Sequence, residues 1–131
     1  LMSMGRFGEA LDAADQAIKA SPGEAACHKA RAAVLIHLDR HAESLDACDR
    51  ALELDAPDLE VSKTRGTALY ALGRYAEALA EYDRAIALDP NDAMPHFGRS
   101  CALRLLGRGD EAHEAYERAA GLDGSVRAYR E

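Results

Sequence analysis

The feature that most constrains the fold of this chain is a repeat with a period of 34 residues. Sliding the sequence against itself by 34 aligns residues 25–58 with 59–92 at 14 identical positions, and 59–92 with 93–126 at 13. Such a period is typical of solenoids built from helix-turn-helix units, each too small to bury its apolar face alone. We expect a single array over residues 1–131: a partial repeat, mainly a second helix, at 1–24, full repeats at 25–58, 59–92 and 93–126, and the start of a further helix at 127–131.

Composition and local pattern predict that every element is a helix. The chain has 28 Ala and 16 Leu, whereas Val, Ile and Thr together number eight, which disfavours strands. In repeat 59–92, apolar residues recur at helical spacing until Gly73 ends the first helix, and a second helix is expected at about 76–88. Asp92 can cap the helix that follows. In the partial repeat, Gly5-Arg6-Phe7 align with the turn Gly73-Arg74-Tyr75.

These positions resemble a tetratricopeptide repeat (TPR). Within residues 59–92 the resemblance is carried by Gly66, Leu69, Leu72-Gly73-Arg74-Tyr75, Ala78, Tyr82, Ala85 and Pro90. The Trp position of the family instead holds His28, Ser62 and His96. The resemblance, which is to a bacterial-type array, implies an all-α fold: a right-handed α-solenoid of antiparallel helix pairs, the TPR superhelix. The small-residue spacing specifies this fold more than it specifies a function.

In TPR arrays the first helix of each repeat lines a concave face that commonly holds a peptide, so the resemblance implies a protein or peptide partner. Lys29 and Lys63 would make one side of this groove cationic, and Met94 and Phe97 would make one end apolar. Small residues, among them Gly98, would leave room for a ligand backbone. We expect a peptide with acidic and apolar anchors, although both lysines could simply be solvated. The residues carried over to this face are Lys29, Ala33, Ile36, Lys63, Thr64, Thr67, Tyr70, Met94, Phe97, Cys101 and Arg104.

One specialised TPR class is excluded by its residues. Arrays that clamp the acidic C-terminal tails of chaperones require lysine, asparagine and arginine at five groove positions. The matching positions here are Lys29, Ala33, Thr64, Met94 and Gly98, of which only the first fits. Without four of the donors, the charge-assisted network that fixes a carboxylate cannot form.

A column of arginines on the first helices faces an acidic column on the second helices. We expect partly buried, bidentate pairs that pin the helices together, within a repeat or to the preceding one. A structural role is favoured over ligand contact for this Arg–acid ladder, which comprises Arg31, Arg65, Arg99, Asp15, Asp49, Asp83 and Glu117.

Charge and the remaining motifs exclude several function classes. A net charge of −7 and a pI near 5.2 disfavour binding to nucleic acid or to an anionic membrane. His37 and His41 are spaced like a metal pair, but no third ligand is spaced plausibly. No nucleophile, base and orienting group recur together, so we expect no catalysis, no metal and no cofactor. Three well-separated cysteines without a disulfide pattern suggest a reducing, cytoplasmic location.

Three functions remain after these exclusions. The preferred one is a protein-interaction scaffold that is part of a longer protein, since both ends of the sequence align with partial helices. The others are a regulatory or substrate-docking segment of a larger enzyme and an RNA-binding helical repeat, although the groove lacks the basic surface that RNA requires. The first full helix has lost most of its preceding partner, so its apolar residues Phe7, Leu11, Ala14 and Ile18 are expected to be exposed and to promote self-association.

Overall fold

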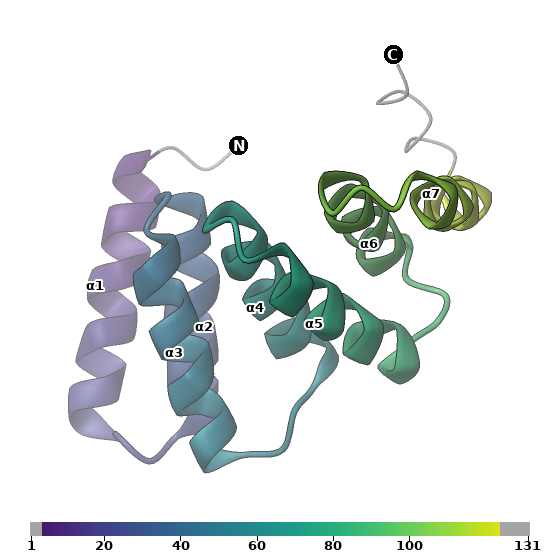
Figure 1. Ribbon diagram of the computed structural model, residues 1–131. Coiled ribbons are helices and arrows are strands. Elements are labelled where there is room, and N and C mark those ends of the chain that lie inside the picture. The colour runs from purple at the N-terminus through teal and green to yellow at the C-terminus, as the bar shows by residue number, and fades with distance from the viewer. Residues whose placement is uncertain (1–3, 124–131) are drawn as a thin grey trace.

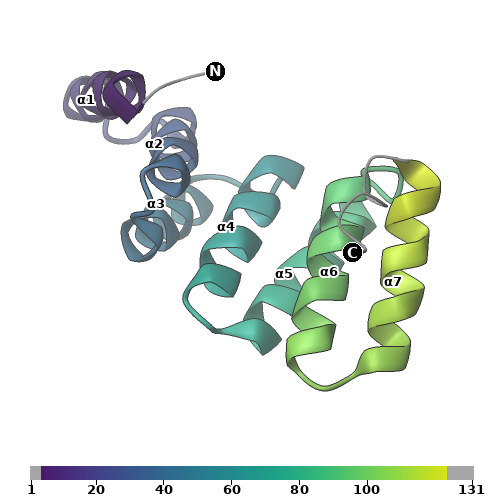
Figure 2. The same ribbon diagram turned by 90° about the horizontal axis from the view of Figure 1, so that it is seen from above.

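The structure, a computed structural model, describes residues 4–123 as seven α-helices joined by short loops (Figure 1). Successive helices run in opposite directions and follow one another along a curved array (Figure 2). The all-α repeat fold expected from the sequence is confirmed. The residues at 127–131, expected to begin a further helix, lie outside the described part. The helices are α1 (Met4–Ala20), α2 (Ala25–His37), α3 (His41–Leu54), α4 (Leu59–Ala71), α5 (Tyr75–Leu88), α6 (Ala93–Leu105) and α7 (Gly109–Leu122).

The tight turns inside the helix pairs depend on one residue with a positive φ. Gly73 and Gly107 adopt φ of 79° and 80°, a left-handed conformation that glycine adopts without steric cost. The next N–H then bonds back to the helix, as Arg74 N does to the Leu69 carbonyl at 2.9 Å. Asp39 takes the same role in the first pair with φ 58°, which aspartate tolerates better than most residues.

The start of α1 differs from the repeat pattern. Gly5, Arg6 and Phe7 align with the turn at 73–75, but all three lie inside α1. Extending an existing helix gains one hydrogen bond per ordered residue, whereas the turn needs a completed helix before it to supply the carbonyl acceptors. The predicted turn is therefore absent, and α1 has 17 residues where α3, α5 and α7 have 14.

The apolar stripe of α1 is packed, which corrects the expectation that it is exposed. Leu11 and Ala14 are buried, and Leu11 belongs to a core cluster that includes Leu35 of α2 and Cys48 of α3. Phe7 stacks on His37 with ring centroids 4.5 Å apart. Phe7 and Ile18 are only half-buried, so self-association through α1 stays a prediction.

The core repeats with the sequence. Leu35, Leu69 and Leu103 are each fully buried at the same place in α2, α4 and α6. Around them lie small residues that let the helix axes approach closely, and Ser44 donates a 2.7 Å hydrogen bond to the Ala32 carbonyl. The buried small residues are Ala32, Ala68, Ala102, Ser44, Ala78, Ala112, Ala51, Ala85 and Ala119.

The Trp position of the TPR pattern is used in two different ways. His28 and His96 are buried, and their Nε2 atoms lie 3.0 and 2.9 Å from the carbonyl oxygens of Pro22 and Pro90 in the preceding loops. Ser62, which replaces histidine in the middle repeat, is too short for this contact, and its buried hydroxyl has no hydrogen-bond partner. The histidines therefore tie helix to loop in two of the three repeats.

Candidate peptide-binding groove

The first helices of the three complete repeats, α2, α4 and α6, form a groove on the inner side of the array. α4 contacts both α2 and α6. A cavity of about 210 Å³ lies between them and includes six of the eleven residues expected at the peptide site. We call this cavity the central groove, and its lining is Ala33, Ile36, His37, Glu60, Lys63, Thr64, Thr67 and Met94.

Neither groove lysine is available as a free cation, which corrects the expectation of a cationic side. Lys29 Nζ lies 2.6 Å from Asp58 Oδ2, and Lys63 Nζ lies 2.7 Å from Asp92 Oδ2. Both lysines are about three-quarters buried in side-chain area. Each positive charge therefore already has a carboxylate partner inside the fold.

The same two aspartates cap the next helices. Asp58 accepts a hydrogen bond from the Val61 N–H at the start of α4, and Asp92 accepts one from the Met94 N–H at the start of α6. Burial tends to raise the pKa of Asp92, but the hydrogen bonds from Lys63 and Met94 outweigh it and the pKa is lowered. Each of these aspartate side chains therefore joins two consecutive repeats, and its negative charge stabilises the N-terminal end of the helix that it caps.

We expect Asp92→Ala to lower the free energy of unfolding by about 2 kcal/mol, about half from the lost cap and half from the lost ion pair. Asp92→Asn is the matched control, because asparagine keeps the cap and loses only the charge. A group whose pKa is lowered in the folded state stabilises above its unfolded pKa, near 3.9 for aspartate, and this contribution is lost as the pH falls below it. The difference between wild type and Asp92→Asn should therefore shrink below about pH 4 in urea unfolding titrations. A constant difference from pH 3 to pH 7 would contradict this assignment.

Gly98 does not leave room for a ligand, which is a second correction. A Cβ built on Gly98 would lie 2.5 Å from Cζ of Tyr82, and one on Gly66 would lie 2.9 Å from Cε1 of the same ring. Tyr82 of α5 is 3% exposed. The two glycines therefore accommodate a side chain of the protein itself, between α4 and α6.

Three of the remaining five expected site residues lie toward the C-terminal end of the array. Phe97, Cys101 and Arg104 line a larger cavity of about 590 Å³ between α6 and α7. Tyr70 instead contacts Tyr75 of its own repeat, with ring centroids 5.4 Å apart. The structure thus divides the expected peptide site between the central groove and a separate pocket, while Lys29 lies beside a third, smaller cavity.

The arginine column pairs with the preceding repeat. Nε of Arg31, Arg65 and Arg99 lies 2.8, 2.9 and 2.7 Å from Oδ1 of the aspartate sixteen residues earlier, respectively Asp15, Asp49 and Asp83. Each pair is made through Nε alone, so the expected bidentate geometry is wrong. The arginine side chains are 21–28% exposed and the aspartates 43–51%. These pairs join α1 to α2, α3 to α4, and α5 to α6.

The bidentate arginine pairs occur at the turns and not in the Arg–acid ladder, where they were expected. Arg74 forks onto Glu77 through Nε and Nη2 at 2.8 and 2.7 Å, and the same contacts recur in the other two complete repeats. The hydrogen bonds from Arg74 lower the pKa of Glu77. The signal was present in the sequence as an Arg-x-x-Glu spacing repeated every 34 residues, namely Arg40–Glu43, Arg74–Glu77 and Arg108–Glu111.

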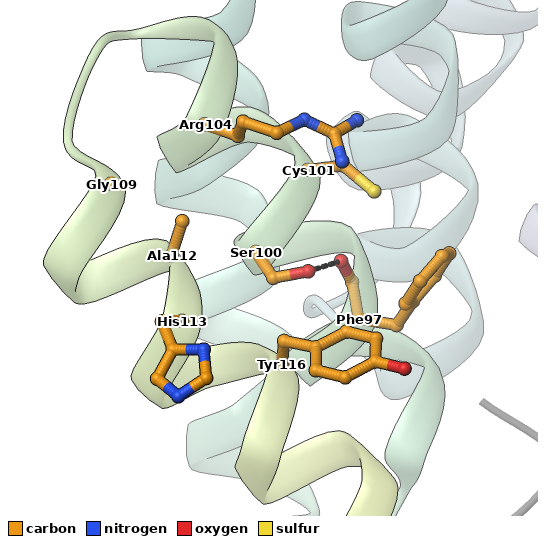
Figure 3. Close-up of a pocket in the computed structure, with 8 residues that line it drawn as sticks. All are labelled: Phe97, Ser100, Cys101, Arg104, Gly109, Ala112, His113 and Tyr116. Carbon is orange, nitrogen blue, oxygen red and sulfur yellow. Dashed lines mark hydrogen bonds between the residues drawn. The ribbon is translucent and has the colours of Figure 1, made fainter. Parts of the chain in front are cut away.

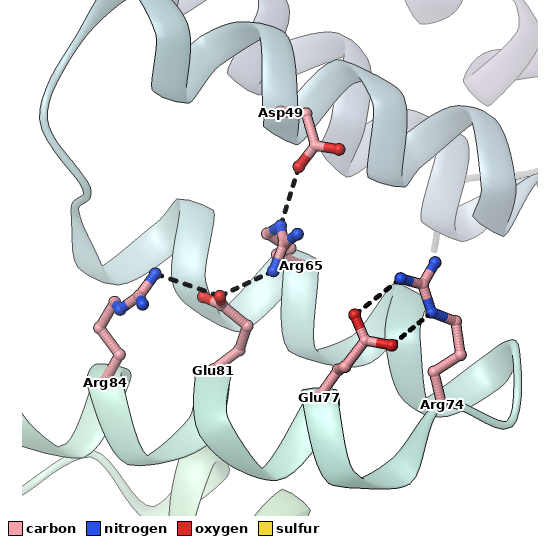
Figure 4. A network of polar contacts seen from close by, with 6 residues as sticks. All are labelled: Asp49, Arg65, Arg74, Glu77, Glu81 and Arg84. Carbon is pink, nitrogen blue, oxygen red and sulfur yellow. Dashed lines mark hydrogen bonds and ion pairs between the residues drawn. The ribbon is translucent and has the colours of Figure 1, made fainter.

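The middle repeat adds a buried carboxylate that the repeat pattern does not contain. Glu81 of α5 is 4% exposed and contacts Arg65 Nη1 at 2.8 Å and Arg84 Nη1 at 3.2 Å (Figure 4). The equivalent positions in the other repeats are Ala47 and Ala115. Arg65 therefore holds two carboxylates at once, one on α3 and one on α5.

Histidine, cysteine and acidic side chains do not gather into a metal site in residues 4–123. That part of the chain contains no group of three or more His, Cys, Asp or Glu side chains placed to hold a metal ion. His37 stacks on Phe7, and His41 Nε2 lies 3.6 Å from Asp39. The burial of Cys48 raises the pKa of its thiol to about 12. No described helix is long and apolar enough to span a membrane.

Two family models match the sequence. A tetratricopeptide repeat model matches residues 1–58, and a TPR repeat model matches residues 66–99. The chain is a TPR protein. TPR repeats generally mediate contacts between proteins and are typically non-enzymatic, so the array is a protein-interaction scaffold.

Comparison with solved structures agrees with the TPR fold. "Crystal structure of MamA" has a TM-score of 0.85 at 22% identity, over 92% of this chain and 70% of that one. "MamA 41-end from Desulfovibrio magneticus RS-1" also has a TM-score of 0.85, at 21% identity over 92% of this chain and 68% of the other. At such identities the likeness shows a shared fold alone. No curated protein sequence matches the chain.

Proposed function

We propose that this TPR array binds an uncharged, partly apolar peptide segment of a partner protein in the central groove. The observation that carries the proposal is a cavity lined by three successive first helices, whose lysine is already paired inside the fold. A ligand therefore gains little from acidic anchors at this point. Binding would depend on shape and on apolar contact.

The lining suits a peptide backbone with small apolar side chains. Ala33 and Thr64 present short side chains on facing helices, and Ile36 and Met94 supply apolar surface at the edges. Met94 is 36% exposed, so burying it against a ligand is favourable. Hydroxyl groups of threonine can donate to or accept from main-chain amides of the ligand.

Ala33→Arg tests the site directly. Ala33 is exposed on α2 and lines the groove, so arginine there fills the cavity without disturbing the core. Its effect is measured on a peptide array that contains neutral, acidic and basic sequences, followed by titration of the best binders. We expect those binders to be neutral and apolar, and Ala33→Arg to weaken them by about tenfold or more, which corresponds to 1.4 kcal/mol.

Ala80→Arg is the matched control, because Ala80 is an exposed alanine on α5, which does not line the groove. It should leave binding within about twofold of wild type, far below the tenfold that 1.4 kcal/mol represents. Binding should also depend weakly on salt. Selection of acidic peptides, or equal binding by both variants, would place the site elsewhere.

A further inference from the structure

The junction between α2 and α4 contains a small space that the side chains around it leave open. A cavity of about 50 Å³ lies between these two helices and is bordered by Cys48 of α3. Ala33, Glu60 and Thr64 line both this cavity and the central groove. The cavity is therefore a side pocket of the central groove, and we call it the Cys48 pocket.

The repeat pattern explains why this space is open. The position of Cys48 holds tyrosine in the other two complete repeats, as Tyr82 and Tyr116. Between α4 and α6 the ring of Tyr82 packs against Gly66 and Gly98, where a Cβ would lie 2.9 and 2.5 Å from it. The ring of Tyr116 borders the larger cavity between α6 and α7 (Figure 3). A thiol is much shorter than a phenol ring, so it fills less of the equivalent space between α2 and α4.

The residues on the two facing helices fill only part of the difference. Ala32 and Thr64 stand at the positions that Gly66 and Gly98 hold in the next junction. Each adds a short side chain to its helix, and the Cys48 pocket is the space that remains beside them.

The inner lining of the Cys48 pocket is apolar. Ala32, Cys48 and Val61 are each at most 3% exposed and offer methyl groups and a thiol. Burial raises the pKa of this thiol to about 12, so it is uncharged at neutral pH. Water is held poorly at such a surface, because a bound water needs about two to four polar partners. An apolar group that displaces it is therefore favoured.

The two charged residues that border the pocket face carboxylate or ammonium groups of the protein itself. Lys29 Nζ lies 2.6 Å from Asp58 Oδ2, and Glu60 Oε2 lies 3.7 Å from Lys63 Nζ. A side chain that enters the pocket therefore gains more from apolar contact than from charge.

The volume of the pocket limits the size of its occupant. An apolar cavity of about 150 Å³ in another protein takes up benzene, a ring of six carbons. The Cys48 pocket has about a third of that volume and so has room for two or three carbon atoms. An isopropyl group, the side chain of valine, has this size.

We propose that the Cys48 pocket is the anchor subsite of the central groove and takes a valine side chain of the bound peptide. The proposal rests on the proposed function above and names the residue that the groove selects. The valine enters between Ala33 and Thr64, and its methyl groups occupy the space between α2 and α4 that the Tyr82 ring occupies between α4 and α6. Alanine leaves the pocket partly empty, and leucine exceeds its volume.

The first test is an NMR titration of the full 131-residue chain with three blocked amino acids: N-acetylvaline N-methylamide and its alanine and leucine counterparts. The methyl signals of Ala33 and Val61 report occupancy of the pocket. We expect saturable shifts and binding of the valine compound about tenfold tighter than the alanine compound, which lacks two methyl groups. Leucine should bind at least about threefold more weakly than valine. Equal affinity for all three compounds would overturn the proposal.

Variants of Cys48 change the size of the pocket from inside. Cys48→Ala enlarges it and should shift the preference from the valine to the leucine compound. Cys48→Met fills it and should weaken the valine compound by about tenfold. Thr64→Ile fills the pocket from α4 and should cause the same loss, so the test does not depend on the folding of Cys48→Met. Cys27→Ala, which removes a thiol of α2 outside the pocket, is the matched control and should change nothing.

Peptides selected on the array separate this subsite from the groove itself. We expect the best binders to share a valine at one position and to lose affinity with Ala33→Arg and with Cys48→Met. Peptides that lose affinity with Ala33→Arg alone would overturn the subsite and keep the groove. A valine compound that binds while no peptide responds to Ala33→Arg would overturn the peptide groove, and with it the role of the pocket as a peptide anchor.

Discussion

Gly98→Thr is expected to lower the free energy of unfolding by about 2–3 kcal/mol, since it forces extra atoms into a packed junction. The Cβ position lies 2.5, 2.7 and 2.8 Å from three atoms of the Tyr82 ring. The ring cannot move away easily, because Gly66 lies close to the same ring and the side chain is 3% exposed. Urea denaturation followed by circular dichroism measures the change.

Gly8→Thr is the matched control, because no atom lies within 4 Å of a Cβ placed on Gly8 inside α1. It should change stability by less than about 0.5 kcal/mol, the difference in helix propensity between the two residues. The double variant Gly98→Thr with Tyr82→Cys should recover about 1–2 kcal/mol relative to the sum of the single changes, since it reproduces the Cys48 and Thr64 junction. If the change in the free energy of unfolding of the double variant equals the sum of the two single changes, this junction does not depend on size matching.

Arg65→Met is expected to cost about 3 kcal/mol, the low end of the range for breaking a buried ion pair. Arg65 is the partner of Glu81, a carboxylate that is 4% exposed, and it also holds Asp49 on the preceding helix pair. Once Arg65 is removed, only Arg84 remains beside Glu81, at 3.2 Å. Thermal unfolding and urea denaturation should both report the loss.

Arg31→Met controls for the loss of an arginine from the ladder, because the residue that matches Glu81 in its repeat is Ala47. It breaks a half-buried pair with Asp15 and a longer 3.8 Å contact with Glu43, and should cost less than about 1 kcal/mol. Adding Glu81→Ala to Arg65→Met should restore much of the stability, since it removes the uncompensated charge and matches Ala47 and Ala115. A double variant as unstable as Arg65→Met alone would mean that packing of the arginine stem, and not the buried carboxylate, sets the cost.

Charge in this protein is arranged to hold repeats together and not to attract ligands. Each first helix carries an arginine that binds back to the preceding repeat, and the lysines of α2 and α4 bind forward to the caps of the next first helices. The lining of the central groove includes one lysine and one glutamate, Lys63 and Glu60, whose formal charges cancel. For this reason, the net charge of the chain is a poor guide to its partner.

The candidate site was predicted in part. The repeat period placed Ala33, Thr64 and Thr67 on one face, and the structure brings them to one cavity. The period could not show that Lys63 is paired with Asp92, because the two residues are 29 positions apart and meet only through the angle between successive repeats. Likewise, the sequence alone suggests that Gly98 leaves space for a ligand. The ring that occupies this space belongs to Tyr82 on another helix, and the repeat period does not show that contact.

The 34-residue period, the glycine or aspartate at each turn and the small residues at the helix contacts are local signals, and they suffice to predict the helix pairs and their order after α1. The ion pairs of the lysines, the ring that packs against Gly66 and Gly98, and the cavities that remain can be seen only in the tertiary structure. These properties depend on distances of a few ångströms between side chains of neighbouring repeats. A periodic pattern specifies that equivalent residues share a face, but the residue opposite each face changes from one junction to the next, as Cys48 and Tyr82 show.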